Sequence, residues 1–284
     1  MTKMLFLAVM TLALAAAQNP NTSAAQSSAN QPQTQIASRF TVAPSSGEDA
    51  IARRARGYIE QMVAALGGDT YIHAQGFFYR GRSGGFSNRE LNSLMNVEVW
   101  DKFTPQGEKQ RVEHPKEPGW VTIFSGDNAW DITYHGTRQL EAKYVDSWKR
   151  RQAHSLGRVV RVWLRDPKTI YFDDGEQFFE ANPAHAVTII NGQNESVTVL
   201  IDPKTFLPAK MEWKSRDTTY HDQFSEAMVY DKYREVDGVQ TPFILGYYRN
   251  DELAGQTFVT EATYADFPDA IFTPEYKSAA PRPK

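Results

Sequence analysis

Short segments that alternate apolar and polar residues, separated by turn residues, fill most of the chain between Ala74 and Tyr264. A period of two is typical of β-strands that turn one face toward a core. Because the links between these segments are short, neighbouring strands are expected to run antiparallel, as a meander. The expected strands are Ala74–Arg80, Met95–Phe103, Lys109–His114, Trp120–Phe124, Ala129–Thr133, Ala186–Ile190, Ser196–Ile201, Ala209–Lys214, Tyr230–Val236, Pro242–Tyr248 and Gln256–Tyr264.

Two stretches show helical spacing instead. Ser45 to Glu48 fits a capping box and predicts an amphipathic helix that ends before Gly67-Gly68. The stretch from Thr137 to Arg165 interrupts the strands and predicts two helical segments with an apolar stripe and basic flanks. The residues of that stripe are Leu140, Tyr144, Trp148, Leu156, Val159, Val160, Trp163 and Leu164.

Several expected strands are apolar on both faces. Residues 196–201 and 186–190 lack clean alternation, and around residues 239–248 one face carries Phe243, Leu245 and Tyr247. A sheet with water on one face alternates more clearly. We therefore expect each face to be covered, either by packed helices or, on one side, by a bound ligand.

The N-terminal 46 residues are expected to lie outside the folded domain. Lys3, the apolar run Met4–Leu14 and Ala15-Ala16-Ala17 have the layout of a secretory signal peptide over residues 1–17. An uncleaved anchor is the alternative. Cleavage near Ala17 would make the protein periplasmic or secreted. Residues 18–46 predict a disordered polar tether, 47–276 a single domain and 277–284 a disordered tail.

Composition excludes several classes of protein. The chain has no cysteine, which excludes thiolate nucleophiles, cysteine-ligated zinc and iron–sulfur clusters. A net charge of −3 gives no electrostatic basis for binding nucleic acid. The six histidines form no zinc motif, and neither a phosphate-binding loop nor a dinucleotide fingerprint is present. We expect no cofactor, no metal and no nucleic-acid partner.

One hydrolase motif needs separate treatment. Gly81–Gly85 reads G-x-S-x-G, the pattern of a nucleophile elbow. In a hydrolase, Ser83 would be the nucleophile and Asp202 and His221 would be the other two members of its triad. An elbow requires preceding parallel strands that shape the oxyanion hole, and the sequence offers only one helix before it. A flexible glycine-rich hairpin is therefore the favoured interpretation. The acidic segment Phe172–Glu176 is likewise interpreted as a turn, because it lacks the spacing of a calcium loop.

The order of several motifs resembles the LolA/LolB-like family of periplasmic lipoprotein carriers, which includes the outer-membrane lipoprotein-sorting proteins. Val121–Trp130 resembles the family's strand, glycine turn and tryptophan-bearing strand. Leu200–Pro208 is similar to its Asp-x-x-Thr-x-Leu-Pro hairpin, Tyr233–Pro242 to its Asp-Gly-Val strand entry, and Ala265–Pro274 to its closing Phe-x-Pro. The chain departs from the family in its greater length and its polar N-terminal stretch, and it lacks the acylated cysteine of the membrane-anchored branch.

The resemblance implies an α+β fold in which a strongly curved antiparallel sheet, a half-open barrel, is covered by helices. It also implies a non-enzymatic carrier whose hydrophobic interior takes a lipid or an acylated lipoprotein, exchanged with a membrane donor or acceptor protein. A protein-interaction or sensor module of the same fold is the alternative. The expected cavity and lid residues are Trp130, Tyr144, Trp148, Leu156, Trp163, Phe243, Leu245 and Tyr247.

Overall fold

The computed structural model describes residues 49–116, 120–216 and 222–283. The predicted signal peptide, the predicted tether, the capping box and His221 lie outside the described residues. In the described part of the chain, no helix is long and apolar enough to cross a membrane.

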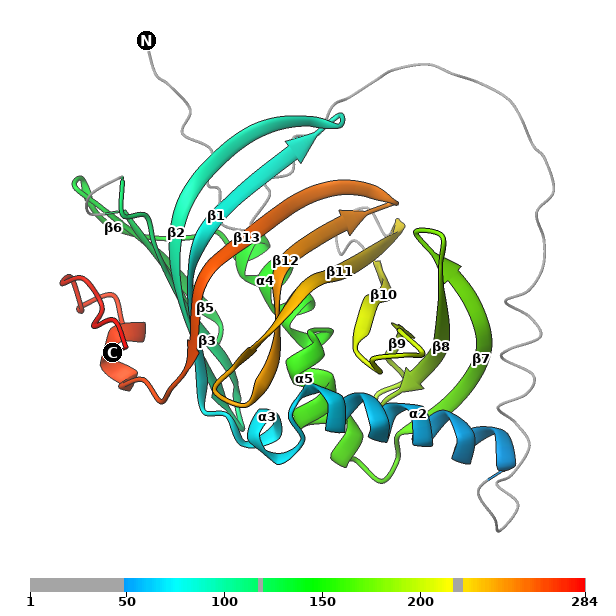
Figure 1. Cartoon of the computed structure of the whole chain (residues 1–284). Helices are drawn as coiled ribbons and strands as arrows, with labels where there is room; N and C mark the ends of the chain where they lie inside the picture. Colours follow the sequence, from blue (N-terminus) through cyan, green and yellow to red (C-terminus); the bar gives the residue numbers. More distant parts are fainter. Residues whose placement is uncertain (1–48, 117–119, 217–221, 284) are drawn as a thin grey trace.

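One continuous antiparallel sheet of 13 strands dominates the described residues (Figure 1). Two meanders, β1 to β6 and β7 to β13, are joined into this sheet because β1 pairs with β13. The predicted antiparallel meander and the strongly curved, open sheet are therefore confirmed. The strands are β1 (Gly76–Ser87), β2 (Glu90–Thr104), β3 (Gly107–Glu113), β4 (Val121–Ser125), β5 (Asn128–Thr133), β6 (Gly136–Gln139), β7 (Ile170–Phe179), β8 (Asn182–Ile190), β9 (Ser196–Ile201), β10 (Pro208–Arg216), β11 (Gln223–Val236), β12 (Val239–Arg249) and β13 (Glu252–Tyr264).

One helix reveals how strongly the sheet curves. In α4 (Ala142–Ala153), Trp148 stacks on Phe124 of β4, while Arg150 bonds Glu226 of β11, the strand that pairs with β10. In a flat sheet β4 and β11 would lie roughly 29 Å apart, because six inter-strand steps separate them. A 12-residue helix is only about 18 Å long. The two wings of the sheet must therefore bend toward each other around α4.

The helices cover one face of the sheet, which we call the helix-covered face. α2 (Ala50–Leu66), α3 (Asp69–His73), α5 (Leu156–Arg161) and the 3₁₀ turn η1 (Trp163–Arg165) pack there on β8 to β12. Asp49 caps the N-terminus of α2, where its side chain accepts a hydrogen bond from the Ile51 amide at 3.3 Å, and Gly67 caps the C-terminus. The main core consists of the apolar stripes of α2 and α5 against alternate residues of the strands, among them Val187, Ile189, Val197, Val199, Ile201 and Met211.

Within the described residues, the opposite face, which we call the open face, is covered at one end by the C-terminal segment. Phe267 and the 3₁₀ turn η2 (Asp269–Phe272) pack there on Phe78 and Trp100. The predicted disorder of residues 277–284 is wrong for residues 278–282, because the Ala280 amide donates to Glu113 and Trp100 donates to the Pro281 carbonyl oxygen. Arg111 is fully buried and donates to the carbonyl oxygens of Ile271, Tyr276 and Ser278 at 2.9–3.2 Å, so it fixes this segment to β3.

Three predicted boundaries or loops also differ from the structure. Phe172–Glu176, interpreted as a turn, lies inside β7, where a bulge at Asp173 to Gly175 absorbs the acidic residues. The interruption of strands does not begin at Thr137, because residues 136–139 form the edge strand β6. β11 starts at Gln223 rather than Tyr230, since its first residues pair with β10 despite their mixed polarity.

Candidate functional site

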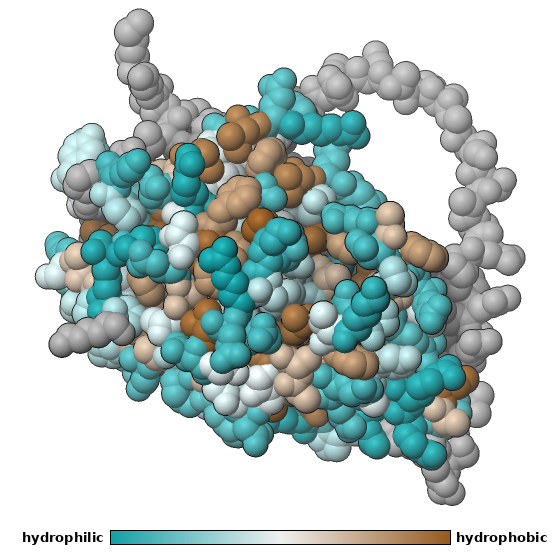
Figure 2. All heavy atoms as spheres, in the orientation of Figure 1, coloured by the Kyte–Doolittle hydropathy of each residue, from teal (hydrophilic) through white to brown (hydrophobic). Residues whose placement is uncertain are grey.

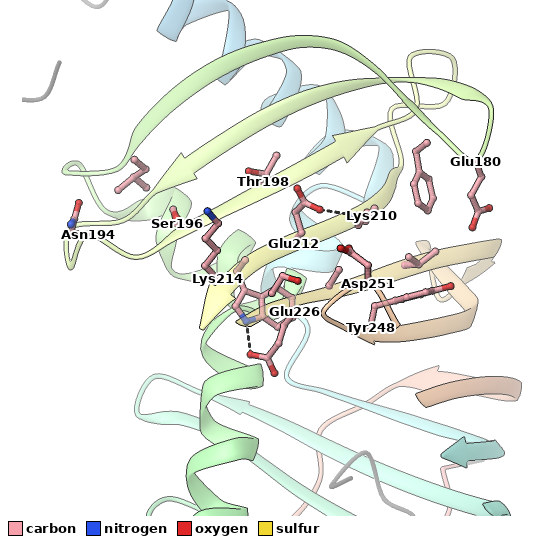
Figure 3. A pocket seen from close by; sticks show the side chains of 16 residues that line it. Glu180, Asn194, Ser196, Thr198, Lys210, Glu212, Lys214, Glu226, Tyr248 and Asp251 are labelled. Atoms are coloured by element: carbon pink, nitrogen blue, oxygen red, sulfur yellow. Dashed lines mark hydrogen bonds and ion pairs between the residues drawn. The ribbon is translucent and has the colours of Figure 1, made fainter. Parts of the chain in front are cut away.

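A groove of about 820 Å³ lies on the open face (Figure 3). Its floor is made by rows of paired residues across β9, β10 and β11, of which Thr198, Glu212 and Ala227 form the central row. Phe179 and Glu180 of the β7–β8 hairpin line one side, and Tyr248 and Asp251 of the β12–β13 hairpin line another. The volume is in the range of sites that bind small molecules.

The lining of the groove is both apolar and charged. Phe179, Ile190, Ala227, Val229 and Tyr248 supply apolar surface. Among the charged residues, Lys210 is paired with Glu212 at 2.5 Å, and its ammonium lies 6.0 Å from the centre of the Phe179 ring. In Figure 3, Glu180 and Asp251 lie toward one end of the groove and Asn194 and Ser196 toward the other. Such a lining suits a ligand that has both an apolar part and polar groups.

A buried carboxylate connects the floor of the groove to α4. Glu226 is 1% exposed and lines the groove, and it accepts hydrogen bonds from Trp213 Nε1 and Arg150 Nε, both at 3.1 Å. The hydroxyls of Ser215 and Tyr247 also donate to it. Burial by itself would raise the pKa of Glu226, but these hydroxyls and the charge of Arg150 lower the pKa below its ordinary value. The ionised carboxylate therefore holds α4 against β11.

Polar side chains also gather under the helices, on the helix-covered face of the β2–β3 hairpin. Burial raises the pKa of Asp101 to about 7, against the opposing effects of a 2.9 Å hydrogen bond from Gln110 and the charge of Arg161. Burial, with the nearby charge of Asp101, raises the pKa of Glu108 to about 8. The Arg161 guanidinium lies 3.8 Å from the centre of the Phe103 ring. Arg161 also donates to the Tyr71 carbonyl oxygen at 3.1 Å, so this residue connects α5 to α3 and to the Phe103 ring of the hairpin.

The structure does not bring the eight predicted cavity and lid residues together. Tyr144 and Trp148 of α4 pack on Phe124 of β4, and Leu156 and Trp163 pack in the main core. Three further residues face the helices from β12: Phe243 is buried, Leu245 packs against the main core, and Tyr247 bonds Glu226. Trp130 lies on the opposite face, against the cluster formed with the C-terminal segment. None of the eight residues lines the groove. Their role in binding a ligand stays a prediction.

The nucleophile-elbow interpretation of Ser83 is wrong. Gly81 to Gly85 form neither an elbow nor a hairpin, because they lie within β1, which continues to Ser87. Ser83 is 7% exposed, and its hydroxyl is 3.1 Å from the Thr257 hydroxyl of β13. Asp202 accepts from the amides of Lys204 and Thr205 at 2.8 Å and so shapes the β9–β10 turn. In the described ranges, no group of three or more His, Asp or Glu residues could hold a metal ion.

The groove was not predicted because the apolar side of each strand gives the stronger signal in the sequence. The floor is made by the other side of β10, where Lys210, Glu212 and Lys214 alternate with Met211 and Trp213. That alternation was visible in the sequence. What the sequence did not show is that the β7–β8 hairpin bends over the open face, which places Phe179 against Ala186 and Leu200 and forms a wall.

Comparison with known proteins identifies the fold. No family model and no curated protein matches the chain. A solved DUF1329 family protein from Desulfovibrio piger is 11% identical, covering 79% of this chain and 99% of its own, with a TM-score of 0.53. A domain from Vibrio parahaemolyticus named for outer-membrane lipoprotein sorting is 9% identical, covering 79% and 98%, with a TM-score of 0.51. At such identities the likeness shows the fold alone, and at that level it confirms the resemblance predicted from the sequence.

Proposed function

We propose that this chain, which has the fold of a lipoprotein-sorting domain, is a non-enzymatic binding or carrier protein for a hydrophobic, acylated ligand. The ligand is a lipid or an acylated lipoprotein, and the open-face groove is its site. The proposal includes export to the periplasm after cleavage near Ala17, followed by exchange of the ligand with a membrane donor or acceptor.

The observation that carries the proposal is the groove itself. It has a volume of about 820 Å³, a floor that combines Ala227 and Val229 with polar residues, and aromatic side chains on two sides. Apolar burial contributes about 25 cal/mol per Å² without directional bonds, so acyl chains of differing length can bind in one groove. The polar residues at the ends of the groove offer hydrogen bonds to a head group or to a peptide. The fold supports a lipid or an acylated lipoprotein as the ligand, because a solved domain of the same fold is named for lipoprotein sorting.

The experiment is a binding titration with cis-parinaric acid, a fluorescent fatty acid. Thr198→Trp places a large side chain at the centre of the groove floor, between Glu212 and the β8 strand. We expect this variant to lose most of the fluorescence enhancement, because the added indole occupies the volume that the acyl chain needs. Thr137→Trp is the matched control, since Thr137 is exposed on the edge strand β6 at the far end of the sheet.

Unfolding curves of both variants establish that the folded fraction is unchanged. Wild-type protein that shows no enhancement, and carries no lipid extractable into organic solvent, would refute the proposal. Equal binding by wild type and Thr198→Trp would refute the assignment of the groove.

A further inference from the structure

Two leucines stand exposed near the tip of the β1–β2 hairpin. Leu91 is 52% exposed and Leu94 is 40% exposed, although large aliphatic side chains are usually buried. A β-carbon added to Gly84 would lie 2.9 Å from Leu91 Cδ1 and 3.5 Å from Leu94 Cδ1. Both leucines therefore lie across the bare backbone of β1 on the open face. Within the glycine-rich segment that resembled a hydrolase motif, Gly84 leaves the backbone bare where these leucines pack over it.

An apolar strip continues from these leucines to the groove. Gly84 pairs with Gln256 of β13, and two residues further along that strand Phe258 is 41% exposed on the same face. Phe258 in turn pairs with Ile244 of β12. Figure 2 shows apolar side chains gathered over this part of the sheet.

The strip meets the groove at Gly246. A β-carbon there would lie 3.0 Å from Tyr248, 3.7 Å from Leu253 and 3.7 Å from Val229. Tyr248 and Val229 line the groove, so apolar side chains lead from the hairpin tip to the site, with Gln256 as the polar residue between Gly84 and Gly246. Contiguous exposed apolar surface on a folded protein marks an interaction site.

Arginines border the strip. Arg82 is exposed on the open face, paired across the strands with Phe258. Arg89 is exposed at the tip of the hairpin, where Asn88 and Arg89 have φ values of 52° and 64°, as a tight two-residue turn requires. Arg89 Nε lies 3.9 Å from a carboxylate oxygen of Glu252, and both side chains are exposed. Apolar side chains flanked by exposed arginines suit a surface of anionic lipid, where the guanidinium groups meet phosphates and the apolar groups enter the acyl layer.

We propose that this strip, from Leu91 and Leu94 through Phe258 to Tyr248, docks on an anionic lipid bilayer. The inference rests on the proposed function, because the strip then gives an acyl chain an apolar path from the bilayer into the groove. Docking itself needs only the strip and its arginines.

Flotation with lipid vesicles tests the docking. Wild-type protein is expected to float with vesicles of phosphatidylcholine and phosphatidylglycerol, and less with phosphatidylcholine alone. Leu91→Ser/Leu94→Ser should lower the bound fraction at least about tenfold, since two apolar side chains no longer enter the bilayer. Ile51→Ser/Ile170→Ser is the matched control, because Ile51 and Ile170 are 50% and 45% exposed on α2 and β7, away from the strip. Arg82→Gln/Arg89→Gln should weaken binding to the anionic vesicles specifically.

The two proposals fail in different ways. Binding of cis-parinaric acid without vesicles reports the groove, and flotation reports the strip. Loss of flotation in the leucine variant supports docking even if no fatty acid binds. Flotation of that variant at the wild-type level overturns docking. Docking is also overturned if wild-type protein does not float. If the wild type is then a dimer and the leucine variant a monomer, the strip binds a second copy of the chain instead.

Discussion

Replacing Glu226 should detach α4 from the sheet at a measurable cost. In Glu226→Ala, the donors of Trp213, Ser215 and Tyr247 lose their acceptor inside the protein. A buried donor left without a partner costs about 1–3 kcal/mol, but the two hydroxyls can turn toward each other, so we expect a loss of about 3–5 kcal/mol. Arg150, whose side chain is 23% exposed, regains water and adds little. Glu226→Gln keeps the volume and one acceptor oxygen, so the expected loss is about 2 kcal/mol.

Urea unfolding at several pH values measures this effect and tests its cause. Because the folded-state pKa of Glu226 is lowered, its contribution to stability is present above its ordinary pKa of 4.5 and is lost as the pH falls through the folded value. The gap between wild type and Glu226→Gln should therefore shrink in acid. Glu212→Gln is the control, since Glu212 is partly exposed and its pair with Lys210 is worth at most about 1 kcal/mol. Equal stability of wild type and Glu226→Gln at neutral pH, or a gap that does not change in acid, would refute this account of α4.

Three further predictions concern other parts of the molecule. Asp101→Asn should match the stability of wild type in acid but exceed it by about 1–3 kcal/mol at alkaline pH. The reason is that the raised pKa of Asp101 makes its ionisation in the folded state costly as the pH rises through about 7. Urea unfolding at several pH values measures this difference, and a difference that does not change with pH contradicts it. Arg111→Lys should release residues 271–278, since an ammonium cannot reproduce the three bonds to their carbonyl oxygens; faster amide exchange there is the readout, and unchanged protection contradicts it. Ser83→Ala should leave fluorophosphonate labelling unchanged, because the Ser83 hydroxyl is buried against Thr257; loss of a label present in wild type would restore the hydrolase interpretation.

The sequence predicted the sheet well because its strands carry their own signals. Alternation between Lys210 and Lys214, and the short turns after Ile201 and Val236, depend on neighbouring residues only. The antiparallel meander follows from those turns. β7 was not predicted because Asp173, Asp174 and Gly175 break the alternation of apolar and polar residues. The bulge that accommodates them depends on pairing with β8. The ordered C-terminal segment escaped for a similar reason, since its partner is Arg111, more than 150 residues earlier.

The site could not be predicted because it depends on how strands far apart in the sequence bend. Tyr248 and Phe179 become opposite walls only through the curvature of the sheet. The aromatic and aliphatic residues of α4, α5 and η1 were the strongest apolar signal in the sequence. In the structure, Trp148, Leu156 and Trp163 are buried by contacts within the protein. A residue's hydropathy predicts burial; it does not distinguish burial against the protein from burial against a ligand.

The most direct test of where the ligand binds is photo-crosslinking with a diazirine-labelled fatty acid, followed by mass spectrometry of the labelled peptides. Labels confined to residues 196–229 and to the hairpins that carry Phe179 and Tyr248 would agree with binding in the open-face groove. Labels on residues 142–163, which form α4, α5 and the start of η1 on the helix-covered face, would contradict it.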